Sequence, residues 1–359
     1  MPALLGAPRY AAADARVRAR SALLLGREQW RQVISARGPG GVVSALRDSG
    51  YGEALAEVDS RHPDLVEVER ILRSALARSW HLPVRFVQGR TRKLLQWRWR
   101  RFEVENLKTV LRAVGGDGAL VDAGRRLLRL PASRVPWAEL AEVSSVSSVE
   151  GLLGDGAAAS FYGRILEEAS DRYRETGDIA VLEVALDLAW WRRLLRLAIR
   201  LTGDDRVHAL RFVGSEADAF NVAWAFRMRV FLNLPPEEIL LHTLHRHVRA
   251  DAGVVRRIAD GATPAEIASA LWGDRLPGAD RLAELDDRQA VLELESALQR
   301  HLLALAVGSR AGFSMNLGGI LAFQTVVENE VRDLVTVLEA KVGDLDEERV
   351  VRHLIGDRL

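Results

Sequence analysis

A short pattern of residues recurs along this 359-residue chain and constrains its fold more than any other feature. An acidic residue, two spacers and an asparagine precede apolar residues at helical spacing in residues 101–112, which read RFEVENLKTVLR, and in residues 218–227, which read DAFNVAWAFR. An altered copy occupies residues 330–338, and a weaker one opens the chain at residues 11–18. The positions equivalent to the asparagine are 14, 106, 221 and 333, at intervals of 92, 115 and 112 residues. These intervals exceed the roughly 20 to 50 residues of solenoid repeats and indicate three divergent, domain-sized units.

Each copy of the pattern predicts a buried polar junction. The acid and the asparagine are three residues apart, as in Glu103 and Asn106, so they share a helix face that becomes apolar further on. A buried polar group without a partner costs about 1–3 kcal/mol, so we expect each acid to bond a neighbouring helix end or an arginine. No histidine joins this face, which disfavours a metal site or a catalytic carboxylate. The predicted structural-motif residues are Asp14, Arg16, Arg18, Glu103, Asn106, Arg112, Asp218, Asn221, Arg227, Glu330 and Asp333.

The hydrophobic periodicity predicts an all-α protein. No segment alternates apolar and polar residues between hairpin turns, and helix should exceed the usual share of about one third. Residues 10–36 read as one helix, which the glycines and proline of 38–41 end. The run Thr263-Pro264-Ala265-Glu266 reads as a capping box, and Asp344 is the expected N-cap of a short final helix.

Composition narrows the possible functions. The net charge is +1, so no global electrostatic field indicates nucleic-acid binding. The absence of cysteine excludes disulfides and thiol catalysis. No window holds about 18 uninterrupted apolar residues, so we expect no membrane span. The opening Met1–Gly6 is too short and uncharged for a secretory signal, and we therefore expect a cytoplasmic protein.

The sequence carries no catalytic signature. No phosphate-binding loop, nucleophile elbow or dinucleotide-binding glycine pattern is present. The histidines that follow Ile239 do not have the i, i+4 spacing of a helical zinc site. We therefore expect a protein that is not an enzyme, has no cofactor and has no metal site.

Two runs combine arginine with tryptophan and lead towards copies of the pattern. Their side chains have two interpretations. Arginine stems can cover apolar surface with their charged heads in water, or the runs can contact an acidic protein or an anionic membrane surface. Nucleic acid is disfavoured by the overall charge. The candidate partner-binding residues are Trp97, Arg98, Trp99, Arg100, Arg101, Trp190, Trp191, Arg192 and Arg193.

Taken together, the copies resemble the central-stalk subunit of V-type ATPases and ATP synthases, which is the C subunit in prokaryotes and the d subunit in eukaryotes. Residues 14–20 look like the opening N-A-R-V-R-x-R of that family, and residues 103–112 look like its D-x-x-N-L-K-x-x-L-R. Residues 218–227 are similar to its next copy, and residues 316–338 to its final long helices. The chain departs from the family pattern at four positions, with Asp14 for Asn, Glu103 for Asp, Asp333 for Asn, and Glu339 where other copies have Arg.

The resemblance implies an all-helical funnel of three similar units around a pseudo-threefold axis. The expected segments are residues 1–100, 101–215 and 216–329, followed by C-terminal helices in 330–359. The mouth of the funnel would receive the end of the central shaft, and its base would sit on the membrane proteolipid ring. The protein would transmit torque for proton or sodium transport, catalyse nothing, and be peripheral to the membrane. The alternative is a free-standing helical scaffold or adaptor.

Overall fold

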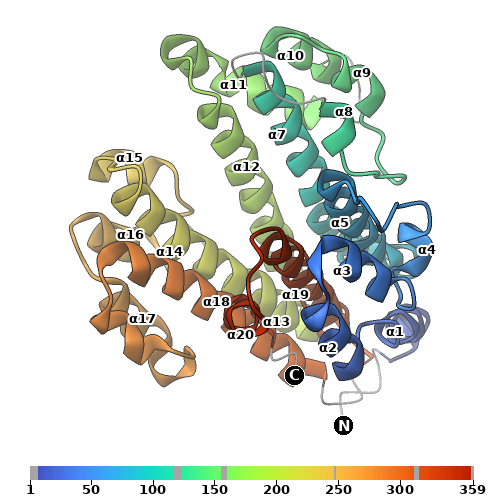
Figure 1. Ribbon diagram of the computed structural model, residues 1–359. Helices are drawn as coiled ribbons and strands as arrows, with labels where there is room; N and C mark the ends of the chain where they lie inside the picture. Colours follow the sequence, from blue (N-terminus) through green and yellow to red (C-terminus); the bar gives the residue numbers. More distant parts are fainter. Residues whose placement is uncertain (1–6, 116–122, 155–159, 246–247, 311–314, 357–359) are drawn as a thin grey trace. The chain divides into compact units, whose positions relative to one another are not determined.

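The computed structural model describes residues 7–115, 123–154, 160–245, 248–310 and 315–356, and these are predominantly helical (Figure 1). Within these ranges no residue belongs to a β-strand. The expected all-α fold class is therefore confirmed.

The elements follow one another as a series of short and long helices. In chain order they are α1 (Ala7–Ser21), α2 (Arg27–Ser35), α3 (Gly38–Leu46), α4 (Gly52–Leu55), α5 (Leu65–His81), the 3₁₀-helix η1 (Leu82–Phe86), α6 (Gly89–Trp99), α7 (Arg101–Gly115), α8 (Ala123–Arg126), α9 (Trp137–Ala141), α10 (Val146–Gly154), α11 (Ser160–Thr176), α12 (Ala180–Ile199), α13 (Gly203–Ala209), the π-helical turn η2 (Leu210–Gly214), α14 (Ser215–Val230), α15 (Pro236–Leu241), α16 (Ala252–Ala259), α17 (Pro264–Trp272), the 3₁₀-helices η3 (Gly273–Arg275) and η4 (Ala279–Glu284), α18 (Asp287–Arg310), α19 (Leu317–Val342) and α20 (Glu347–His353).

The chain forms two compact units. One comprises Arg16–Phe86, Leu95–Trp190 and Glu330–Leu359 and is called the α7 unit here. The other comprises Met1–Ala15, Val87–Leu94 and Trp191–Asn329 and is called the α14 unit. The four segments expected from the sequence describe repeats along the chain, and they remain a prediction.

In the α7 unit, helix α5 begins where Asp64 accepts a hydrogen bond from the backbone N–H of Val66 at 3.1 Å. Such a cap satisfies one of the backbone donors that every helix N-terminus leaves without a partner. Helix α7 packs against α8 and α10. Its Phe102 ring meets Trp80 of α5 edge-on, with the centroids 5.3 Å apart. The motif helix is thus held on several sides by its own unit.

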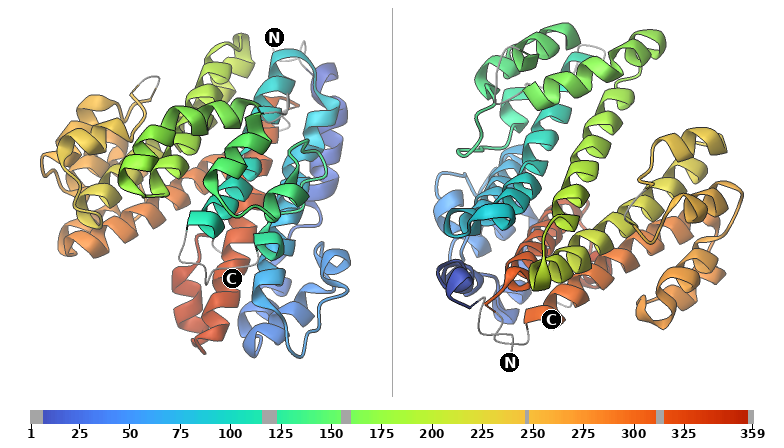
Figure 2. Two further views of the ribbon diagram at one scale, coloured as in Figure 1. Left: turned by 90° about the horizontal axis from the view of Figure 1, so that it is seen from above. Right: turned by 180° about the vertical axis from the view of Figure 1, so that it is seen from behind.

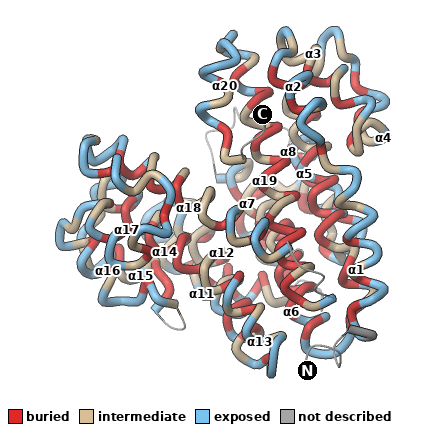
Figure 3. The backbone as a smooth tube through the Cα atoms, turned by 90° about the horizontal axis from the view of Figure 1, so that it is seen from below, coloured by how far each residue is buried: buried red, intermediate tan, exposed pale blue. Residues whose placement is uncertain are grey.

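In the α14 unit, helix α14 packs against α16 and α18, with α15 and α17 completing the group (Figures 1 and 2). Val222, Phe226, Met228, Ile258 and Leu294 are fully buried in its core. Buried and exposed positions alternate along α18, as expected of an amphipathic helix (Figure 3). Helix α14 is buried or half-buried at every position except Arg227. This arrangement places the second motif helix at the centre of its own apolar cluster.

The expectation of one helix across residues 10–36 is wrong. Helix α1 ends at Ser21, and α2 begins at Arg27 after the N-cap residue Gly26. The backbone N–H of Leu25, which lies in the break, donates to a carboxylate oxygen of Glu330 at 2.9 Å. A contact between residues 305 positions apart therefore takes the place of a local helical bond.

The length and hydropathy of the helices decide whether any of them could cross a membrane. Among the residues that the structure describes, none of the helices combines the length and the apolar character that crossing a bilayer requires.

Candidate functional site

The asparagines of two motif copies form the same buried junction. Asn106 on α7 donates to the carbonyl of Leu128 at 3.0 Å and accepts from the backbone N–H of Leu128 at 2.8 Å. Asn221 on α14 donates to the carbonyls of Leu244 and Ala250, both at 2.7 Å, and accepts from the N–H of Leu244 at 2.8 Å. A carboxamide can donate and accept at once, which this pairing requires. Each asparagine thereby fixes a loop to a motif helix.

The last copy forms a related junction with a different side chain. Asp333 on α19 accepts from the backbone N–H of Ile355 at 2.8 Å and from that of Gly356 at 3.0 Å. These partners lie 22 and 23 residues further along the chain, as Leu128 lies 22 residues beyond Asn106. The backbone presents two donors here, and a carboxylate offers only acceptors. The departure from asparagine therefore matches the local backbone.

The acids three residues earlier are buried as well. Glu103 accepts from the Ser133 hydroxyl and the Tyr162 hydroxyl, both at 2.6 Å. Glu330 accepts from the Tyr51 hydroxyl at 2.9 Å, in addition to its bond from Leu25. These hydrogen bonds tie each motif helix to neighbouring elements of the α7 unit.

Asp218 holds the corresponding position in the α14 unit. One of its oxygens accepts from the backbone N–H groups of Arg249 and Ala250 at 2.6 and 2.9 Å. Burial raises the pKa of Asp218 above its ordinary value, and the two backbone donors partly offset this. The carboxyl group is therefore held in a setting that partly favours its neutral form.

The motif arginines form bidentate ion pairs at equivalent positions. Arg112 binds Glu183 of α12 through two contacts of 2.5 and 2.9 Å. Arg227 binds Glu295 of α18 in the same way, with one contact at 2.6 Å. The hydrogen bond to the glutamate raises the pKa of each arginine. In the last copy the equivalent residue is Glu339, which is exposed.

The first copy is placed differently. Asp14 is half-buried on α1, and Arg18 is exposed. The guanidinium of Arg16 lies over the ring of Phe86, 5.6 Å from its centroid. The segment after this copy supplies Leu25 and Tyr51 to Glu330 of the last copy. The two ends of the chain thus build one junction together.

The arginine–tryptophan runs contribute largely to the interior. The indole N–H of Trp97 donates to the carbonyl of Trp190 at 2.9 Å, and that of Trp190 donates to the carbonyl of Trp97 at 2.9 Å. Trp99 donates to the carbonyl of Ala77 at 3.0 Å. Arg98 is 1% exposed and lies over the Trp80 ring at 4.6 Å. These four run residues are buried, so they cannot form an exposed contact surface without a rearrangement.

The remaining run residues reach the surface. Arg100 is half-buried over Trp97 and lies 3.6 Å from Glu103. Arg101 pairs with Glu105 at 3.1 Å. Trp191 is half-buried against Phe220, with the ring centroids 5.4 Å apart. Arg192 and Arg193 are exposed.

Sequence reasoning missed several partners of the motif. Tyr162 follows Glu103 by 59 residues, and Tyr51 precedes Glu330 by 279, so no local pattern links them. The glutamates that pair with the arginines do carry a signal. Glu183 and Glu295 lie 71 and 68 residues after their arginines, a near-constant spacing that the repeat would reveal.

The fold and its sites define a class of protein. The described helices repeat buried structural junctions, and no group of three or more histidine or acidic residues among them could hold a metal ion. A family description for the ATP synthase (C/AC39) subunit matches residues 13–353, and the chain belongs to this family of non-catalytic rotary ATPase subunits. The expected family is thus confirmed.

Curated relatives agree with this assignment. The C subunit of the A-type ATP synthase of Methanocaldococcus jannaschii is 26% identical over 358 residues, covering 97% of this chain and 86% of the relative. The protein of the same description from Haloferax volcanii is 27% identical, covering 95% and 96%. That of Thermococcus kodakarensis is 22% identical, covering 97% and 90%. The similarity therefore extends over nearly the whole chain and is not confined to one motif.

Proposed function

We propose that this chain is the rotor subunit that joins the central shaft of a V/A-type rotary ATPase to the membrane proteolipid ring. It transmits torque for proton or sodium transport and catalyses no step itself. The family match over residues 13–353 supports this proposal. The observation that carries it is the repeated polar junction, built at Asn106, Asn221 and Asp333 with partners 22 or 23 residues further on. Such repetition favours three similar helical units, which a funnel with pseudo-threefold symmetry requires.

The junctions suit a part that bears mechanical load. Apolar contacts are non-directional and resist sliding of one element over another weakly. A hydrogen bond loses its energy when distance or angle changes, so a buried carboxamide that holds one loop through two bonds resists shear. The bidentate pairs Arg112–Glu183 and Arg227–Glu295 add geometric specificity at equivalent positions. Each motif helix is thereby held in register with its surroundings.

The accessible arginines are candidate contacts with the neighbouring subunits. We propose Arg100, in the turn between α6 and α7, and Arg101, at the start of α7, for this role. Separately, we propose Trp191, Arg192 and Arg193 on α12. The guanidinium group binds carboxylates in a bidentate manner, which the shaft end or the ring loops would offer. The protein would act on the cytoplasmic face of the membrane, attached through the complex.

The proposal is tested by removing the subunit from a reconstituted rotary ATPase in vesicles. ATP hydrolysis and ion uptake are measured side by side, with and without the chain added back. We expect hydrolysis to continue without the chain and ion uptake to stop, because the shaft would turn without driving the ring. Ion uptake that persists without the chain would refute the coupling role and favour the scaffold interpretation.

A further inference from the structure

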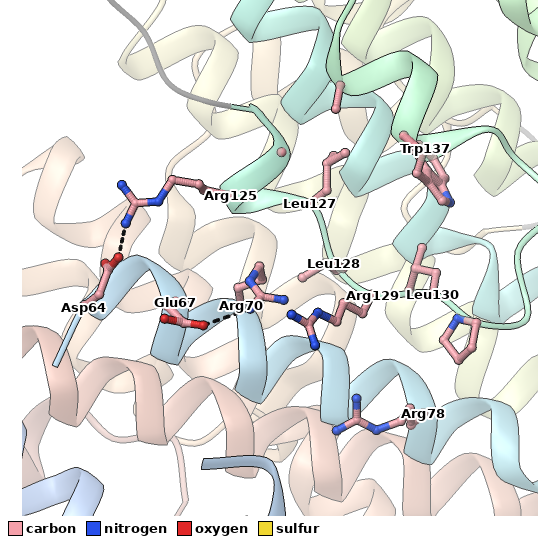
Figure 4. A pocket seen from close by; sticks show the side chains of 14 residues that line it. Asp64, Glu67, Arg70, Arg78, Arg125, Leu127, Leu128, Arg129, Leu130 and Trp137 are labelled. Atoms are coloured by element: carbon pink, nitrogen blue, oxygen red, sulfur yellow. Dashed lines mark hydrogen bonds and ion pairs between the residues drawn. The ribbon is translucent and has the colours of Figure 1, made fainter. Parts of the chain in front are cut away.

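A cavity of about 830 Å³ lies along α5 in the α7 unit (Figure 4). Two of the residues that line the cavity are Asp64, the N-cap of α5, and Arg78, fourteen residues further along. At about 1.5 Å per helical residue, the cavity therefore extends roughly 21 Å along the helix. The opposite wall is the segment Leu127–Pro131, and the half-buried ring of Trp137 lies at one side. A second cavity of about 210 Å³ shares Arg78 and Leu130 and continues past the end of α5 to Arg85. We call the two together the α5 groove.

The charges in the α5 groove are unbalanced. Its acids are already paired, because Asp64 binds Arg125 and Glu67 binds Arg70 at 3.3 Å. Arg78 and Arg129 are exposed, and no described carboxylate lies within ion-pair distance of either guanidinium.

The remaining arginines repel one another, which a bound anion would relieve. Burial, together with Arg20 and Arg129, lowers the pKa of Arg78, and only Glu53 opposes this. A ligand carboxylate beside Arg78 and Arg129 would supply the missing negative charge.

The groove also offers an apolar strip and a further donor. Leu127, Leu128 and Leu130 are largely buried along the wall. The indole N–H of Trp137 is buried and has no acceptor among the described residues. An indole N–H only donates, so a ligand that pairs it must bring an acceptor such as a carbonyl or carboxylate oxygen. Donors and apolar surface thus lie on the same path.

We propose that the α5 groove binds an extended acidic peptide segment of a partner protein, with carboxylates at Arg78 and Arg129 and apolar side chains against the Leu127–Pro131 wall. Its length of roughly 21 Å fits about six residues of extended chain at about 3.3 Å each. A single phosphate would fill only one point of it and leave the apolar strip uncovered. This inference does not depend on the coupling role proposed above.

The test uses the full-length chain and a fluorescent peptide of about eight residues in which glutamate and leucine alternate. A matched peptide has glutamine in place of glutamate. We expect the acidic peptide to bind, and the glutamine peptide to bind about tenfold or more weakly, since a guanidinium binds a charged carboxylate more strongly than a neutral amide. Equal binding of the two peptides would overturn the proposal.

Charge reversal locates the site. Arg78→Glu combined with Arg129→Glu should weaken binding of the acidic peptide about tenfold or more, because attraction becomes repulsion. The matched control, Arg37→Glu combined with Arg164→Glu, changes two exposed arginines of the same unit and should stay within about twofold. An equal loss in both variants would mean non-specific attraction and would overturn the proposal.

Two further measurements make the result decisive. Circular dichroism must show the same helix content and melting temperature for both double variants. If the Arg78→Glu, Arg129→Glu variant differs from the control, the variant with Arg78→Ala and Arg129→Ala takes its place. Inorganic phosphate and vesicles with anionic lipid are tested as alternative ligands. If either binds with the same dependence on Arg78 and Arg129 while the acidic peptide does not bind, the groove is a phosphate site and the peptide proposal is wrong.

Discussion

At each motif junction the side chain matches the backbone groups that face it. Asn221 meets two carbonyls and one N–H, whereas Asp333 meets two N–H groups. A carboxamide supplies both a donor and an acceptor, and a carboxylate supplies acceptors alone. The difference between these nearly isosteric residues is therefore specified by hydrogen-bond polarity and not by size.

Exchanging the two side chains tests this directly. Asn221→Asp would place a carboxylate against two carbonyl oxygens, and Asp333→Asn would turn an amide N–H₂ towards a backbone N–H. We expect each change to lower the free energy of unfolding by about 1–3 kcal/mol, the cost of unpaired buried groups. Chemical denaturation measures this. Asp171→Asn, which alters an exposed aspartate, is the control and should change stability little. Unchanged midpoints for both junction variants would contradict the interpretation.

The raised pKa of Asp218 predicts how the stability of the fold changes with pH. Its pKa in the folded protein is raised, so the folded state binds more protons than the unfolded state between the ordinary value of 3.8 and the raised one. Stability therefore falls as pH rises through that window, and the ionised group costs stability above it. One oxygen accepts both backbone bonds, and an asparagine can keep them through its Oδ1.

We accordingly expect Asp218→Asn to be as stable as the parent, or more stable, near neutral pH. The fall in stability as pH rises above about 4 should become shallower than in the parent. Denaturant unfolding at several pH values provides the measurement, with Asp171→Asn as the control that keeps the parent's slope. A strong loss of stability at neutral pH would show that the charge itself is required.

On the scale of elements, the break between α1 and α2 depends on a distant contact. Glu330 of α19 binds Leu25 in the break and Tyr51 at the start of α4. A local signal for the break is Gly26, whose N–H donates to the Gln29 side chain at 3.0 Å, and the distant carboxylate adds a contact that the local sequence does not reveal. Sequence periodicity cannot contain that information, since it reports only neighbours along a helix.

This contact should control the local stability of α2, α3 and α4. Glu330→Leu removes both acceptors and leaves the buried N–H of Leu25 without this partner, so the segment should open more readily. Amide hydrogen exchange in residues 27–55 should accelerate, while exchange in α14 stays unchanged. Tyr162→Phe is the matched control, because it removes the equivalent hydroxyl from Glu103 and leaves Glu330 intact. Similar exchange rates in the two variants would contradict the assignment.

Local signals predicted helix ends with mixed success. The capping box at Thr263 and Glu266 is present, with bonds of 3.2 and 2.9 Å, and that prediction is confirmed. The expected cap at Asp344 is wrong. Asp344 has a φ of 51°, and Asp346 caps α20 by accepting from the N–H of Arg349 at 2.8 Å. Two aspartates so close together offer the same local signal, and only the backbone conformation distinguishes them.

The arginine–tryptophan runs show a second limit of sequence reasoning. Trp97 and Trp190 bond each other's carbonyls across 93 residues, which makes them part of the core. Alternating charged and aromatic residues resemble an exposed contact surface when partners are unknown. Arg98, buried over Trp80, is unsuitable for a surface test, because replacing it would disturb the packing that surrounds it.

On the scale of the whole molecule, the family and the helical class were predictable because the repeated pattern spans the chain. The match to residues 13–353 rests on that extended similarity. Contacts with other subunits were not predictable in the same way, since exposed arginines occur on many surfaces and each contributes little.

The proposed coupling role predicts that changes at Arg192 and Arg193 affect ion uptake in the assembled complex. Arg192 and Arg193 are exposed on α12, and one exposed ion pair contributes only about 0–1 kcal/mol, so single alanine changes should have small effects. Reversing both, as Arg192→Glu with Arg193→Glu, should weaken attachment to an acidic neighbour most strongly at low ionic strength, because added salt screens the new repulsion. In the reconstituted complex at low ionic strength we expect ATP hydrolysis to persist while ion uptake falls below that of the parent. Arg206→Glu with Arg257→Glu, two exposed arginines of the same unit, is the control. If both variants take up ions equally well at low ionic strength, Arg192 and Arg193 do not form the coupling contact, and Arg100 and Arg101 become the surface to test.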